Sequence, residues 1–317
     1  MAYILLIIGF ALLIKGADLF VDGSSNIAKL LRVPSILIGL TIVAFGTSSP
    51  EATVSIIAAL EGNADVALGN VVGSNIFNST LVAGVAAFLY PLRVENETIR
   101  KEIPFTLLAS AALLILMSDI ALQGSGSNLL TRNDGFIFLL FLSIFMYYVI
   151  EIGLKSRKDT ADEPVTEEIS WGKNILITIL GLAAIILGGD LVVANGTEIA
   201  YSLGMSETLV GLTIIAIGTS LPELVTSVSA ALKKESEIAL GNIVGSNIFN
   251  ILFVLGASAS ISPLAANDKM FIDVILMIAL TIILLVFSRT SFKVGKREGL
   301  VLVAAYIIYL VYIILRN

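Results

Sequence analysis

The sequence contains one short motif twice, Gly-Thr-Ser-Ser-Pro-Glu at residues 46–51 and Gly-Thr-Ser-Leu-Pro-Glu at residues 218–223. The two copies are 172 residues apart, and around them 25 of 40 aligned positions are identical between 39–78 and 211–250. Each copy places a proline and a glutamate inside an apolar stretch. The duplication predicts a chain built from two homologous halves, with the same polar feature in each.

The composition indicates a membrane protein. Apolar residues make up 57% of the chain, charged residues 14%, and the mean hydropathy is +0.97, whereas soluble domains average about 25% charged residues. The apolar residues form long stretches, several near the ~20 residues with which a helix spans a bilayer. A nucleic-acid partner would require a basic patch, which the sequence lacks. We therefore expect an all-α membrane protein embedded in a lipid bilayer, with no obligatory protein partner.

The side chains available for chemistry are restricted, because the chain has no Cys and no His. Their absence excludes thiolate chemistry, disulfides and Cys/His metal sites. An intramembrane hydrolase would need a His or Lys base beside its nucleophile, and the candidate polar residues described below have none. We therefore expect a protein that is not an enzyme, uses no cofactor and binds any ion through oxygen atoms.

Ten stretches are apolar enough to be transmembrane helices, five in each half. These expected spans are 2–21, 33–60, 66–91, 103–119, 134–153, 174–194, 207–232, 238–262, 271–288 and 298–315. The hydrophilic linker 154–173 separates a first five-helix repeat, residues 1–153, from a second, residues 174–317. Because five is odd, the second repeat must enter the membrane from the opposite side. Such inverted repeats are typical of secondary transporters, although some channels also have them.

Lys and Arg residues are divided unequally between the expected loops. Fifteen lie in loops on one side of the membrane and three on the other. Cytoplasmic loops carry the excess of positive charge. We therefore expect a multi-pass protein of the cell membrane with both termini outside and the 154–173 linker in the cytoplasm.

The prolines of the repeated motif predict a break in the helix of each half near the middle of the membrane. Pro50 has no N–H group, so the carbonyl of Gly46 loses its helical partner, and Pro222 does the same to Gly218. A freed carbonyl in lipid is costly unless another group uses it, and a cation can do so. Hydroxyl oxygens add to each break, from Thr47, Ser48, Thr219 and Ser220.

The glutamates of the motif, Glu51 and Glu223, follow the breaks directly. A carboxylate in the middle of a membrane costs several kcal/mol and is expected to face the protein interior. One such glutamate could serve only to hold a kinked helix. Two at equivalent places favour a binding role.

The following span carries a second repeated motif, Gly-Ser-Asn-Ile-Phe-Asn, at 73–78 and 245–250. One face of this span is polar in both halves, with Asn70, Ser74 and Asn78 in the first and Asn242, Ser246 and Asn250 in the second. Asn70 and Asn242 have two interpretations, hydrogen bonding between packed helices or ion binding. For the other four side chains we favour ion binding.

The predicted site thus combines two carboxylates with hydroxyl, amide and carbonyl oxygens. Ca²⁺ takes six to eight oxygen ligands, whereas Mg²⁺ requires tight octahedral geometry. One Ca²⁺ or two Na⁺ would neutralise two carboxylates, so the two kinds of ion are expected to compete. Such competition in a two-fold frame predicts an antiporter, and a cation channel is the alternative from another class.

Together the two motifs resemble those of the sodium/calcium exchanger family of the cation/calcium antiporter superfamily, over residues 33–84 and 205–256. The short central linker is similar to that of prokaryotic members. The resemblance implies exchange of Na⁺ for Ca²⁺ by alternating access. It also implies that the first and sixth spans slide across the other eight.

The resemblance further implies a set of ion ligands. Ca²⁺ would bind Glu51, Glu223, Thr47 and Thr219. An outer Na⁺ site would use the Ala216 carbonyl, Thr219, Ser220, Ser246 and Glu51. An inner Na⁺ site would use the Ala44 carbonyl, Thr47, Ser48, Ser74 and Glu223, and a middle position would use Asn78 and Asn250.

Two departures from related families bear on the coupled ion. Potassium-dependent relatives carry Asp where this chain has Asn250, which argues against potassium co-transport. Proton-coupled relatives have a Gly-Asn-x-x-Glu type of motif, whereas this chain keeps the sodium type. We therefore expect Na⁺ as the counter-ion, and Ca²⁺/H⁺ antiport by the same glutamates is the alternative.

Asp18 and Asp190 are also 172 residues apart. One interpretation is that they guide ions at the two mouths of the protein. The other, which we favour, is structural, with Asp18 paired to Lys15 one turn earlier or reaching interfacial water.

Overall fold

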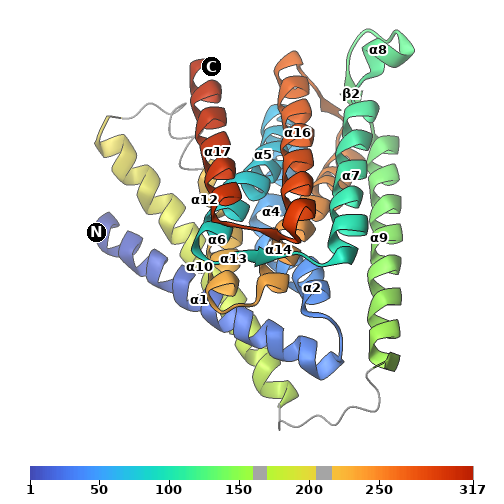
Figure 1. Cartoon of the computed structure of the whole chain (residues 1–317). Helices are drawn as coiled ribbons and strands as arrows, with labels where there is room; N and C mark the ends of the chain where they lie inside the picture. The colour runs from blue at the N-terminus through green and yellow to red at the C-terminus, as the bar shows by residue number, and fades with distance from the viewer. Residues whose placement is uncertain (160–169, 205–215, 317) are drawn as a thin grey trace.

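The computed structural model describes residues 1–159, 170–204 and 216–316, which are mostly helical (Figure 1). The first half contains α1 (Ala2–Leu31), α2 (Ser35–Ile38), η1 (Gly39–Val43), α3 (Ala44–Thr47), α4 (Ser49–Leu60), α5 (Ala64–Phe77), η2 (Asn78–Val82), α6 (Ala83–Leu89), η3 (Thr98–Glu102), α7 (Ile103–Leu116), α8 (Asp119–Gln123) and α9 (Arg132–Asp159), where η marks a π-helix. The second half contains α10 (Trp171–Ser202), α12 (Ala216–Thr219), α13 (Leu221–Leu232), α14 (Ser236–Phe249), η5 (Asn250–Leu255), α15 (Gly256–Ile261), α16 (Asp268–Ser291) and α17 (Lys296–Arg316).

Two short antiparallel ladders link loops of the two halves. β1 (Leu92–Arg93) pairs with β4 (Lys293–Val294), and β2 (Leu129–Leu130) pairs with β3 (Leu264–Ala265). Each ladder joins one strand from the first half to one from the second. The halves are therefore fastened together at their loops as well as through their helices.

Seven helices in the described residues are long and apolar enough to cross a membrane, so the protein is a multi-pass membrane protein. They are Ala2–Leu31, Ala64–Leu89, Arg132–Arg157, Trp171–Ser202, Ser236–Ile261, Asp268–Ser291 and Lys296–Arg316. The pair Ser35–Thr47 and Ser49–Leu60 makes an eighth candidate, bent by 49°. Of the other two expected spans, 103–119 corresponds to the 14-residue α7, and 207–232 lies partly outside the described residues. Ten spans therefore stay a prediction.

The helix breaks lie where the repeated prolines predict them. In the first half α3 ends at Thr47, and Ser48 has φ −81° and ψ 7° before α4 begins. In the second half Ser220 has φ −94° and ψ 8° before α13 begins. In both helices that follow a break, the proline occupies the first turn, where its missing N–H is tolerated.

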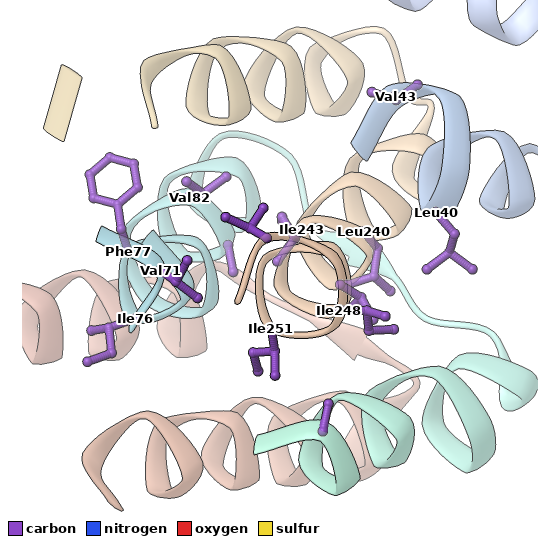
Figure 2. Packing of buried hydrophobic residues seen from close by; sticks show 14 of the residues in the cluster. Leu40, Val43, Val71, Ile76, Phe77, Val82, Leu240, Ile243, Ile248 and Ile251 are labelled. Carbon is purple, nitrogen blue, oxygen red and sulfur yellow. The ribbon is translucent and has the colours of Figure 1, made fainter. Parts of the chain in front are cut away.

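The centre of the molecule is α14, which is almost entirely buried. Figure 2 shows apolar side chains of α5, η1, η2 and η5 packed around it, among them Val71, Leu40 and Val82. A Cβ atom on Gly241 would lie 2.7 Å from the Ile36 carbonyl oxygen. The small residues of α14 therefore let the backbone of the first half approach very closely.

The helices α1 and α10 form a separate, tightly packed pair along one flank (Figure 1). Both are longer than the expected spans 2–21 and 174–194. Glycines line their contact at seven-residue spacing, so that a Cβ atom on Gly16 would lie 2.9 Å from both the Gly181 carbonyl oxygen and the Ala184 Cβ. The pair is held by direct backbone contact, which leaves no room for side chains at these positions.

We expect Gly16→Val to destabilise the protein, because a valine must separate α1 from α10 and overpacking costs about 1–3 kcal/mol. The measurement is the melting temperature of the purified protein in detergent. Gly172→Val is the matched control, since a Cβ atom there has no described heavy atom within 4 Å. Equal melting temperatures for the two variants would contradict the tight contact.

Candidate functional site

The two repeated glutamates are fully buried and meet the helix break of the opposite half. Ser220 Oγ donates a hydrogen bond to Glu51 Oε1 at 2.8 Å, and Ser48 Oγ donates one to Glu223 Oε1 at 2.9 Å. Both glutamate side chains have 0% exposure. The two contacts are equivalent, because each residue in one lies 172 positions from its counterpart in the other. Each half therefore donates the same serine hydrogen bond to the glutamate of the other half.

The helix N-terminus at each carboxylate partly offsets the cost of burying a negative charge. Glu51 lies in the first turn of α4 and Glu223 in the first turn of α13. The N-terminus of a helix carries partial positive charge, which stabilises an acidic side chain there. Burial in the apolar core opposes that charge, and a bound cation would offset the cost.

The threonines of the motif are held by asparagines of the opposite half. Thr47 Oγ1 donates to Asn242 Oδ1 at 3.0 Å, and Thr219 Oγ1 lies 3.4 Å from Asn70 Oδ1. A hydroxyl that donates to an amide still has lone pairs that can face an ion. Both threonines are therefore suited to ion binding, as the sequence predicts.

Asn70 and Asn242 join helices within each half as well. Asn70 Nδ2 donates to the Glu51 carbonyl oxygen at 3.1 Å and to Ser55 Oγ at 2.8 Å. Asn242 Nδ2 donates to Ser227 Oγ at 2.9 Å. These hydrogen bonds between helices are the ones that the packing interpretation predicts.

The predicted serine and alanine ligands lie around the same breaks. Ser74 Oγ is 3.0 Å from Ser220 Oγ, which itself contacts a glutamate. The Ala44 carbonyl oxygen accepts from Ser48 N at 3.0 Å and is 3.3 Å from Thr47 Oγ1. Its counterpart, residue 216, begins α12.

Several predicted ligand oxygens are buried and have no hydrogen-bond partner in the described part of the chain. They are Glu51 Oε2, Glu223 Oε2, Asn78 Oδ1, Asn250 Oδ1 and Ser246 Oγ. A buried polar atom without a partner costs about 1–3 kcal/mol, and more when it is charged. Unpartnered hydroxyls such as Ser24 Oγ occur elsewhere, so the distinguishing feature is the pair of carboxylates. A cation would satisfy all five atoms if they converge on it.

The candidate site contains few acids. Within the described ranges, no three His, Cys, Asp or Glu side chains gather into a group that could hold a metal ion. Binding would therefore depend on two carboxylates and a larger number of neutral oxygens. Such a ligand set suits hard cations of low charge density, such as Ca²⁺ and Na⁺.

A cavity of about 220 Å³ reaches the site beside the first helix break. Its lining is mostly apolar and includes three aromatic rings and three hydroxyl groups, from Phe45, Ser48, Ser49, Ala52, Thr53, Phe249, Phe253 and Val254. Ser48 belongs both to this cavity and to the contact with Glu223. The cavity therefore adjoins one of the two carboxylates.

The prediction that Asp18 pairs with Lys15 is wrong. Ser229 Oγ donates to Asp18 Oδ1 at 2.8 Å, and Lys233 Nζ lies 3.8 Å from the same oxygen. Lys233 Nζ also lies 2.7 Å from Asp22 Oδ1. The pairing joins α1 to α13, and no sequence pattern within α1 could indicate it. Asp190 is exposed.

Asn75 and Asn247 belong to the second repeated motif but were not among the predicted ligands. Both are buried, at 1% and 2% exposure, and a hydrogen bond from Asn75 Nδ2 to the Asn247 carbonyl oxygen joins α5 to α14. Their identity in the two halves was a signal that could have identified them. They lie next to the predicted ligands Ser74 and Ser246.

Comparison with known proteins identifies the family. The profile of the family described as "Sodium/calcium exchanger protein" matches residues 1–151 and 173–315. The sodium/calcium exchanger MaX1 of Methanosarcina acetivorans is 35% identical over 98% of this chain and 97% of its own length. The putative antiporter CaxA of Alkalimonas amylolytica is 40% identical over 97% of each chain.

Solved structures extend the similarity to the fold. A structure of the sodium-calcium exchanger NCX_Mj, soaked with 10 mM Na⁺ and zero Ca²⁺, superposes with a TM-score of 0.84 at 28% identity over 98% of both chains. The similarity in fold therefore extends over nearly the whole chain. The chain belongs to the sodium/calcium exchanger family.

Proposed function

We propose that this cation/calcium antiporter exchanges Na⁺ for Ca²⁺ by alternating access, with the ions bound between Glu51 and Glu223. The observation that carries the proposal is the crossed pair of Ser–Glu hydrogen bonds, which leaves one oxygen of each buried carboxylate unpartnered. Two carboxylates supply a charge of −2. One Ca²⁺ or two Na⁺ neutralise it, so the ions exclude one another from the site.

The proposed ligands keep the roles expected from the sequence. Ca²⁺ binds Glu51, Glu223, Thr47 and Thr219. The outer Na⁺ site comprises the Ala216 carbonyl, Thr219, Ser220, Ser246 and Glu51, and the inner site comprises the Ala44 carbonyl, Thr47, Ser48, Ser74 and Glu223. Asn78 and Asn250 form the middle position. The buried, unpartnered oxygens of five of these residues support the assignment.

The proposed architecture is two inverted five-helix repeats, residues 1–153 and 174–317, joined by the 154–173 linker. Ten spans, with the helix breaks near the membrane midplane, would place the shared site between the repeats. The division of positive residues, 15 against 3, supports a cytoplasmic linker and external termini.

The proposed moving part is the α1–α10 pair. Its glycine contact makes the two helices one body, and bundles that rock against a fixed site are the usual basis of alternating access. The core around α14 is packed against the first half through equally close backbone contacts. On this proposal the pair slides while the glutamates stay in place, and the contacts of Asp18 and Asp22 with α13 change as it moves.

Sodium is the proposed counter-ion. The motif is of the sodium type, and MaX1, which aligns over nearly the whole chain, is named a sodium/calcium exchanger. Neutral hydroxyl and amide ligands also suit an alkali cation better than a proton, which requires a group that titrates. Apart from the two glutamates, the proposed ligands are hydroxyl, amide and carbonyl groups, which do not titrate.

We expect Glu51→Gln and Glu223→Gln each to reduce Na⁺-driven Ca²⁺ uptake by about a hundredfold or more, because the loss of one ligand charge removes roughly 3 kcal/mol of binding free energy. Glutamine keeps the size of the side chain and an oxygen for the serine hydrogen bond. The measurement is ⁴⁵Ca²⁺ uptake into liposomes loaded with Na⁺. Glu151→Gln, at an exposed position of α9, is the control, and wild-type uptake by either site variant would refute the assignment.

The coupled ion is tested by exchanging the gradients. An outward Na⁺ gradient at equal pH should drive Ca²⁺ uptake, whereas a pH gradient without Na⁺ should not, since protons do not replace Na⁺ at the neutral ligands. Uptake that follows the pH gradient and ignores Na⁺ would establish Ca²⁺/H⁺ antiport instead. Flux that never opposes a gradient would indicate a channel.

A further inference from the structure

The second repeated motif contains an asparagine pair that the proposed function does not use. Asn75 and Asn247 each follow a proposed serine ligand by one residue, on α5 and α14. Both are almost fully buried, at 1% and 2% exposure. A buried amide is retained only where its donors and acceptors have partners, so the partners of this pair indicate its purpose.

Asn75 forms the middle of a chain of amide groups. Its Nδ2 donates to the Asn247 carbonyl oxygen at 3.2 Å, and its Oδ1 accepts from Asn250 Nδ2 at 3.1 Å. Asn250 Oδ1 is buried and has no partner among the described residues. The amide nitrogen of Asn250 is thus held by Asn75, and its amide oxygen is available to bind an ion.

The orientation of this chain is set by the backbone. If the Asn75 amide were reversed, its oxygen would meet the Asn247 carbonyl oxygen and its nitrogen would meet the Asn250 nitrogen. Both contacts would be repulsive, because each joins two acceptors or two donors. A main-chain carbonyl can only accept a hydrogen bond, so it fixes the orientation of the Asn75 amide. The Asn75 amide in turn fixes the orientation of the Asn250 amide.

The other half lacks the same arrangement. Asn247 Nδ2 donates to Ser79 Oγ at 2.7 Å, but the residue 172 positions after Ser79 is Ile251, which offers no hydroxyl. Asn247 Oδ1 and Asn78 Nδ2 have no partner in the described part of the chain. Of the two amides at the proposed middle position, only Asn250 is therefore held in one orientation.

We propose that Asn75 is a positioning residue for ion binding, which turns the Asn250 carbonyl toward the transported ions and requires an amide at position 250. An aspartate there would set its carboxylate against Asn75 Oδ1, with no donor between them. Asn75 thereby helps to keep the charge of the site at −2. This inference rests on the proposed function and adds the residue that sets its middle ligand.

The test is a double-mutant cycle in liposomes. We expect Asn75→Ala to raise the half-saturating concentration of the transported ions by about tenfold, because an unanchored amide no longer presents its oxygen. Asn250→Ala should have a similar effect, and the double variant should be no worse than Asn250→Ala alone. Asn75→Ala should also improve Asn250→Asp, since it removes the opposing acceptor.

Two controls separate positioning from stability. Thr281→Val removes a buried hydrogen bond to the Met277 carbonyl, 2.8 Å long, from α16, and should leave half-saturation unchanged. Should Asn75→Ala not fold, Asn75→Ser replaces it in the same cycle, because its hydroxyl keeps the position polar but is one bond shorter than the amide that anchors Asn250.

The inference would be overturned if Asn75→Ala had the half-saturating ion concentration of the wild type, or if the effects of the substitutions at positions 75 and 250 were additive. If Glu51→Gln and Glu223→Gln are inactive while this happens, only the role of Asn75 fails. If both glutamate variants transport normally, the proposed site itself fails.

Discussion

The structure depends on burying two carboxylates in the apolar core of a membrane protein. Glu51 and Glu223 each receive one hydrogen bond from a serine of the opposite half, and each keeps one oxygen without a partner among the described residues. In so apolar an environment a carboxylate stays ionised only with positive charge nearby, and otherwise it is neutralised by a proton. The N-termini of α4 and α13 supply part of that charge at the helix breaks, and in the proposed function the transported ion supplies the rest. On that proposal, one kind of cation binds only after another has left.

The two halves share this interaction but not every detail around it. The same asparagine occurs at 75 and 247, yet Asn247 finds a hydroxyl at Ser79 where Asn75 must use a main-chain carbonyl, because the matching position is Ile251. A duplicated chain inherits equivalent positions, and later substitutions make their surroundings different. In this protein the difference lies one residue from proposed ligands, where it affects how an amide is oriented.

Close backbone contact is used in two places with different consequences. Around α14, glycines allow the backbone of α2 and η1 in the first half to lie directly against a buried helix. Between α1 and α10, glycines join two helices that lie along the flank of the molecule. Both contacts exclude side chains, but only α1 and α10 have one side that faces away from the core (Figure 1). Stiffness within each body and a weaker boundary between them are what alternating access requires.

The sequence by itself determined the membrane class, the helix breaks at Ser48 and Ser220, and the two candidate carboxylates. These features follow from apolar length, from the missing N–H of proline and from repetition, all of which are local or periodic. Only the tertiary structure decided which hydroxyl meets which carboxylate, that Asn70 links helices, and that Asp18 contacts Ser229 and Lys233 rather than Lys15. The bond from Ser220 to Glu51 joins residues 169 positions apart and the contact from Ser229 to Asp18 joins residues 211 apart. Such pairings depend on how helices pack in three dimensions, and no spacing along the chain encodes them.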